Sequence, residues 1–104
     1  MIHLPFDIEK SDLIGNTPNP NKEKILWYMK RAPVSWAAPG VLRDVMTGEY
    51  MHIPWHVHSD GEYAWCSSLW YYVEKYDYEL PADFVEKIVR SSYKELWIAW
   101  YKRP

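Results

Sequence analysis

The sequence predicts a single α+β domain in which one helix is followed by a small antiparallel β-meander and then by two or three helices. The length of 104 residues supports one hydrophobic core but not two. Apolar residues recur at helical spacing near the start and in the last third, whereas short runs rich in Val, Trp, Tyr and Ile fill the middle. With 48% hydrophobic and 25% charged residues, the composition is that of a folded globular protein.

Residues 1–18 are expected to form an irregular arm, and residues 19–104 the domain itself. Gly15 and Pro18 interrupt the arm, whose apolar residues, Phe6 among them, follow no clear period and are expected to dock on the domain. The start of the chain has neither the basic region nor the apolar region of a signal peptide, so we expect a cytoplasmic protein.

The first helix is predicted to run from Asn19 to about Arg31. Asn19 suits the N-cap, and Pro20 suits the first helical position because the N–H that it lacks would have no acceptor inside the helix. Basic residues at the end of this segment suit the negative end of the helix dipole. Pro33 then ends the helix.

Short strands are predicted between residues 34 and 66, with a hairpin at Asp60-Gly61 because both residues tolerate a positive φ. A two-residue turn there places Ser59 opposite Glu62 and divides the side chains between two faces. One face then carries His56, His58, Tyr63 and Trp65, and the other carries Trp55, Val57, Ala64 and Cys66. We expect the second face to pack on the core, and the first to be a recognition face or a face covered by helices.

Helical spacing returns after the strands. One helix is predicted over residues 67–76, capped by a serine, and another over residues 81–90, with Pro81 in its first turn. The pattern of residues 92–101 fits either a last helix or a strand, and both alternatives stay open.

Charge is segregated along the chain, although the net charge is only −2. Residues 44–86 contain nine acidic residues and one basic residue. Such a field repels nucleic acid and anionic membranes and attracts a basic partner; the alternative is a solvated acidic surface neutralised by the basic end of the chain. No apolar run approaches the ~20 residues of a membrane span. Seven Trp and nine Tyr exceed what so small an interior can hold, so some are expected on a recognition surface.

The strongest hint of chemistry is the pair His56 and His58, followed by Glu62. Two histidines on one strand face with a later carboxylate match the ligand arrangement of the first cupin motif, which would hold Fe, Mn or Zn. The predicted hairpin, however, places Glu62 on the opposite face, and no third histidine follows on a later strand. Phosphate-binding loops and hydrolase motifs are also absent from the sequence. We therefore expect no enzyme, no metal and no cofactor, with a metal-dependent small-molecule enzyme or binding protein as the alternative.

Several motifs together resemble a family of small, uncharacterised bacterial proteins that are similar to candidate toxin-immunity proteins. The motifs are Asp60-Gly61-Glu62-Tyr63-Ala64-Trp65, Tyr71-Tyr72-Val73-Glu74-Lys75-Tyr76 and Leu80-Pro81-Ala82-Asp83-Phe84. The resemblance covers about residues 19–90 and implies one fold without a cofactor or an active site.

Charge, aromatic content and resemblance together predict a stoichiometric inhibitor that binds a protein partner, specifically an immunity protein against a bacterial toxin with a basic surface, such as a nuclease. Carboxylates would take the place of substrate phosphates, and aromatic rings would supply the anchors. The residues predicted to bind the partner are Asp60, Glu62, Tyr63, Trp65, Trp70, Tyr71, Asp77 and Glu79. Self-association through the aromatic face is a third hypothesis.

Overall fold

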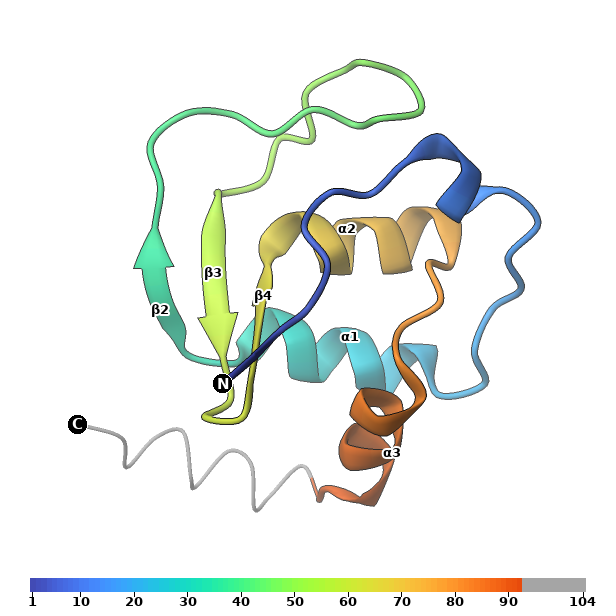
Figure 1. Cartoon of the computed structure of the whole chain (residues 1–104), viewed down its shortest axis with the longest axis vertical. Helices are drawn as coiled ribbons and strands as arrows, with labels where there is room; N and C mark the ends of the chain where they lie inside the picture. The colour runs from blue at the N-terminus through green and yellow to red at the C-terminus, as the bar shows by residue number, and fades with distance from the viewer. Residues whose placement is uncertain (93–104) are drawn as a thin grey trace.

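A computed structural model describes residues 1–92, which form a four-stranded mixed sheet and three α-helices (Figure 1). The strands are β1 (Ile2–His3), β2 (Val34–Ala37), β3 (His56–Ser59) and β4 (Tyr63–Cys66). The helices are α1 (Lys22–Arg31), α2 (Ser67–Tyr76) and α3 (Ala82–Arg90), and a short 3-10 helix covers Lys10–Leu13. The α+β class agrees with the sequence prediction. The open choice between helix and strand for residues 92–101 falls almost entirely outside the described residues.

The sheet is not a simple meander, because the start of the chain adds a parallel strand to it. Its strand order is β1-β4-β3-β2, with antiparallel pairing of β2, β3 and β4 and parallel pairing of β1 with β4. Ile2 pairs with Tyr63, and Leu4 N donates to Ala64 O at 2.9 Å. The segment expected to be an irregular arm therefore supplies an edge strand. A helix is consequently not the first element of the chain.

The hairpin between β3 and β4 turns one residue later than predicted, so each residue of β3 pairs with a residue two positions further along β4, although the two faces are as expected. Asp60 N donates to Tyr63 O, so Gly61 and Glu62 form the turn, and His58 pairs with Trp65. Gly61 takes the positive φ of 98°. A register shift of two residues leaves every side chain on its own face of the sheet.

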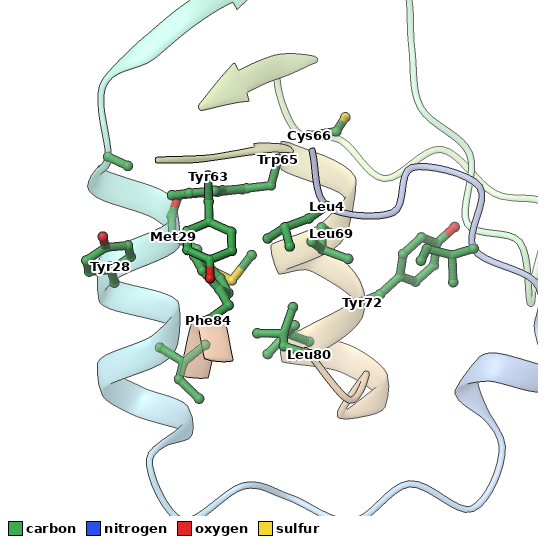
Figure 2. Packing of buried hydrophobic residues seen from close by; sticks show 14 of the residues in the cluster. Leu4, Tyr28, Met29, Tyr63, Trp65, Cys66, Leu69, Tyr72, Leu80 and Phe84 are labelled. Carbon is green, nitrogen blue, oxygen red and sulfur yellow. The ribbon is translucent and has the colours of Figure 1, made fainter. Parts of the chain in front are cut away.

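The face of Tyr63 and Trp65 is covered by the helices, which is one of the two alternatives left open for it, whereas the face expected to pack on the core points away from them. Figure 2 shows Tyr63 and Trp65 pointing from β4 toward α1 and α3, while Cys66 points the other way. The reason is size: two large rings need the depth of a helix layer. The opposite face buries only small side chains, such as Ala64 and Cys66, at the centre of the sheet.

The edge of the sheet opposite β1 is β2, which carries a bulge. Val34 pairs with His58 and Trp36 with Val57, so one extra residue, Ser35, stands in β2 between two successive partners. All four residues of β2 are exposed.

The local sequence explains how the helices begin and end. Asn19 Oδ1 accepts a hydrogen bond from Asn21 N at 2.8 Å, so the asparagine closes a turn before α1 instead of capping it, and the helix begins at Lys22. Asp77 ends α2 in the left-handed conformation with φ of 57°. Pro81 stands at the N-cap of α3, one position before the first helical turn in which the sequence placed it.

Aromatic rings from α1, β4 and α3 form the centre of the core (Figure 2). The Trp65 ring lies 5.2 Å from that of Phe84 and 6.0 Å from that of Tyr28, measured between centroids. Trp65 Nε1 donates to Met29 O at 3.1 Å, which satisfies the buried indole. Phe84 and Ile88, four residues apart on α3, are both fully buried. They attach α3 to the rest of the core.

Replacing Phe84 with Ala is expected to lower the free energy of unfolding by about 3–5 kcal/mol, because it leaves a cavity against Trp65. Urea unfolding followed by tryptophan fluorescence measures the change. Val89→Ala on the exposed side of the same helix is the matched control and should change stability by at most about 0.5 kcal/mol. Equal effects of the two substitutions would contradict this view of the core.

Candidate protein-binding surface

The residues predicted to bind a partner do not gather on one surface. Asp60 and Glu62 lie at the hairpin tip, and Tyr63 and Trp65 lie on the core side of β4. Trp70 and Tyr71 lie on α2, and Asp77 and Glu79 lie beside a groove next to α3.

The two carboxylates at the hairpin tip share the ammonium group of Lys87 on α3. Lys87 Nζ lies 3.1 Å from Asp60 Oδ2 and 2.8 Å from Glu62 Oε1. Tyr28 OH donates to Asp60 Oδ2 at 2.5 Å, and the backbone N–H groups of Glu62 and Tyr63 donate to Oδ1. Burial by itself raises the pKa of Asp60, but these hydrogen bonds and Lys87 bring it below its usual value. Asp60 therefore holds the hairpin against α1 and α3.

The rings of Tyr63 and Trp65 are not available at the surface. Trp65 is 1% exposed, and Tyr63 is also buried, with Lys87 Nζ lying 5.4 Å from the centre of its ring. Either ring could touch a partner only if α3 moved away. The structure thus corrects the expectation of an exposed aromatic face on the β3–β4 hairpin.

Tyr71 on α2 is part of a hydrogen-bond network around Asp44, whose side chain is 1% exposed. Tyr71 OH and Tyr76 OH each donate to Asp44 Oδ2 at 2.8 Å, and Lys75 Nζ lies 3.3 Å from the same oxygen. Met46 N donates to Oδ1 at 2.7 Å. Burial by itself raises the pKa of Asp44, and the hydrogen bonds, those from Tyr71 and Tyr76 first, lower it below its usual value.

This network fixes the long loop between β2 and β3, which stands above the sheet in Figure 1. Asp44 N donates to Glu49 O at 2.8 Å, and Met51 N donates to Leu42 O at 2.9 Å, so the loop forms a small hairpin of its own. The guanidinium of Arg43 lies 4.4 Å from the centre of the Tyr50 ring on its outer side. Connections of this length without regular structure are uncommon and are often binding loops.

Trp70 is half-buried on α2 and packs against a basic residue of α1. Lys30 Nζ lies 5.0 Å from the centre of its ring and 2.8 Å from Glu74 Oε2. The indole Nε1 is buried and has no hydrogen-bond partner among residues 1–92. Trp70 is therefore only partly accessible to a partner.

Asp77 and Glu79 line a groove of about 680 Å³ between residues 15–20 and α3. Asp77 Oδ1 lies 2.6 Å from Lys22 Nζ, so its charge is already paired. Glu79 is exposed and has no hydrogen bond or ion pair in the described part of the chain. Of the predicted carboxylates, Glu79 alone remains unpaired there.

The histidine pair is adjacent but incomplete as a metal site. The rings of His56 and His58 lie 6.1 Å apart, and His58 Nδ1 is 2.9 Å from Ala32 O. The His58 ring is buried and stacks on Trp65. Among residues 1–92, no three His, Cys, Asp or Glu side chains are grouped as metal ligands would be.

Exposed apolar side chains gather instead on the sheet face that points away from the helices. Phe6 is 52% exposed and stacks on the half-buried Trp55, with ring centroids 6.3 Å apart. A Cβ added at Gly40 would lie 3.6 Å from the Trp55 ring, and the neighbouring Val41 is 61% exposed. Trp36, 57% exposed, pairs with Val57 on the neighbouring strand. We call Phe6, Trp36, Val41 and Trp55 the outer aromatic surface.

Sequence reasoning missed this surface because it depends on contacts between distant segments. Phe6 was expected to dock on the domain, and it does contact Trp55, yet half of it stays in solvent. Trp55 was assigned to the core face of the hairpin. The available signal is Trp36, a large ring three residues after Pro33 in the first predicted strand.

Comparison with known proteins gives no match to a family model, to a curated protein or to a solved structure. Within residues 1–92, none of the helices has both the length and the apolar character needed to cross a lipid bilayer.

Asp44→Asn is expected to lower the free energy of unfolding by about 2–3 kcal/mol, because the amide has only one acceptor oxygen. Its NH₂ group must therefore face either the hydroxyls of Tyr71 and Tyr76 or the N–H of Met46, all of which are donors. Urea unfolding measures this loss, and amide hydrogen exchange should show faster opening of residues 43–50. The control is Glu49→Gln, which changes an exposed carboxylate of the same loop and should leave both the free energy of unfolding and the exchange rates unchanged. Unchanged exchange in Asp44→Asn would show that the network does not hold the loop.

His58 is expected to make the protein less stable in mild acid. Burial lowers the pKa of His58 and nearby His56 adds to this, against the contact with Ala32 O, which raises it. Because the unfolded chain then binds a proton more readily than the folded one, stability is complete above about pH 6.5 and falls as the pH decreases below that value. The slope is at most about 1.4 kcal/mol per pH unit.

Urea unfolding at several pH values between 7 and 5 tests this dependence on His58. His58→Gln should flatten the slope relative to the original protein, whereas His3→Gln, at an exposed position, should leave it unchanged. An equal slope in all three proteins would assign the acid sensitivity to other groups.

Proposed function

We propose that the protein binds a protein partner stoichiometrically and without catalysis, and that it acts as an inhibitor. The outer aromatic surface carries this proposal, because exposed clusters of large apolar side chains mark interaction sites on small proteins. Trp, Tyr and Arg dominate binding energy at such sites; Trp36 is exposed on this surface, and Tyr50 and Arg43 are exposed in the loop that follows β2.

The surface is also suited to binding because several contacts hold the Trp55 ring in place. Trp55 is held between Phe6 and the backbone of Gly40, and its carbonyl accepts a hydrogen bond from Ala38 N at 2.9 Å. Side chains that are ordered before binding lose less conformational entropy in the complex. The long loop that begins at Ala38 is fixed in turn by Asp44.

The specific role that we propose is immunity against a bacterial toxin in the cytoplasm, which follows from the resemblance of the sequence motifs. Phosphate mimicry by Asp60 and Glu62 receives no support, since both already pair with Lys87. Recognition would instead depend on apolar contacts from the outer aromatic surface, with unpaired carboxylates such as Glu79 adding attraction for a basic toxin.

Trp36→Ala is expected to raise the Kd for the partner about 30-fold or more, because truncating an anchor ring costs about 2 kcal/mol or more. The product of the neighbouring gene is the first partner to test, with affinity measured by calorimetry and stoichiometry by light scattering of the complex. Co-expression with that product then tests protection of the cells.

The control variant is Ile14→Ala, which shortens an exposed apolar side chain outside the outer aromatic surface and should leave the Kd unchanged. A Trp36→Ala variant that binds the partner as tightly as the original protein would remove the outer aromatic surface from the proposal. Turnover of the partner by this protein would contradict the stoichiometric mechanism.

A further inference from the structure

We propose that the groove between residues 15–20 and α3 binds a short extended peptide segment that carries apolar side chains and a Lys or Arg. This peptide site is separate from the outer aromatic surface and goes beyond the function proposed above. The apolar floor of the groove, the charges around it and its length each support this occupant.

The groove has an apolar floor and an accessible apolar wall. Ile25, Val73 and Leu80 are buried side chains that line it from below. Val85 and Val89, four residues apart on one side of α3, form the wall, and Val89 remains 40% exposed. A volume of about 680 Å³ falls within the range of binding pockets and accommodates several apolar side chains.

The charges around the groove favour a cationic occupant. Lys22 pairs with Asp77, and Arg90 lies 3.8 Å from Glu86 on the same helix, so each basic residue of the rim faces a carboxylate. Glu79 has no partner within residues 1–92. A Lys or Arg of a bound segment would pair with it, whereas an acidic segment would be repelled.

The shape of the groove fits an extended chain. Its α3 wall contains nine residues and is therefore about 13 Å long, which matches about four residues of extended peptide. The opposite wall is an irregular loop, in which the backbone N–H groups of Asn16 and Thr17 have no acceptor among the described residues. Such groups can pair with the main chain of a bound peptide, as in strand addition to a free edge.

Three acetylated and amidated pentapeptides test the inference on the full chain: Lys-Leu-Val-Leu-Lys, Glu-Leu-Val-Leu-Glu and Lys-Ser-Gly-Ser-Lys. Titration is followed by backbone amide NMR. The first peptide is expected to bind with a Kd below about 1 mM and to shift amides of residues 15–20 and 82–90. The charge-inverted and polar peptides should bind at least about ten-fold more weakly. Shifts confined to other regions, or equal binding of all three peptides, would overturn the proposal.

Two exposed substitutions test the named contacts with little risk to folding. Glu79→Gln should weaken binding of the first peptide about two- to five-fold, as expected for the loss of an exposed ion pair. Val89→Lys places a cation on the apolar wall and should weaken binding of the first peptide further. Glu49→Gln should leave the Kd for this peptide unchanged. Unchanged affinity in both groove variants would overturn the assignment. Trp36→Ala should bind the peptide normally, so this inference and the proposed function can fail independently.

Discussion

Two buried carboxylates determine how the elements of this protein are held together. A charge removed from water must be paired and hydrogen-bonded, or the cost of burying it amounts to several kcal/mol. Asp60 meets this requirement through Tyr28 of α1, Lys87 of α3 and the backbone of its own turn. Asp44 meets it through α2 and its own loop. Each of the three helices thus supplies donors that a neighbouring connection needs, which ties the loops of the sheet to the helix layer.

The pairing of these carboxylates changes how the many acidic residues between positions 44 and 86 are interpreted. A run of carboxylates in the sequence is indistinguishable from an acidic surface until their partners are known. Here Asp60 and Glu62 neutralise Lys87, which comes from the more basic end of the chain. Much of the segregated charge is therefore internal neutralisation, the alternative that the sequence left open. The described surface therefore carries no single-signed field of the strength that the sequence alone suggests.

How far the sequence predicts this structure depends on the range of the interactions. The helices of residues 67–76 and 81–90 could be located because helical periodicity and the signal of Pro81 are local, although Cys66, and not a serine, stands at the N-cap of α2. The hairpin faces could be assigned because side chains alternate, but the turn could not, since the Asp60 carboxylate accepts the turn hydrogen bonds itself. The parallel pairing of Ile2 with Tyr63 joins residues far apart in the chain and leaves no local pattern. The groove and the outer aromatic surface depend on such long-range contacts, so neither could be predicted.

The bulge at Ser35 has a consequence for how the protein behaves at high concentration. Ser59 N donates to Pro33 O and Ala38 N to Trp55 O, both at 2.9 Å, so the main-chain groups of Val34 and Ala37 point outward from the β2 edge. A regular strand presents such groups every second residue, whereas here they are three apart. A regular incoming strand could match one of the two positions but not both, so the bulge disfavours pairing of a second molecule through β2. Trp36 can therefore remain exposed on a strand whose irregular edge disfavours aggregation.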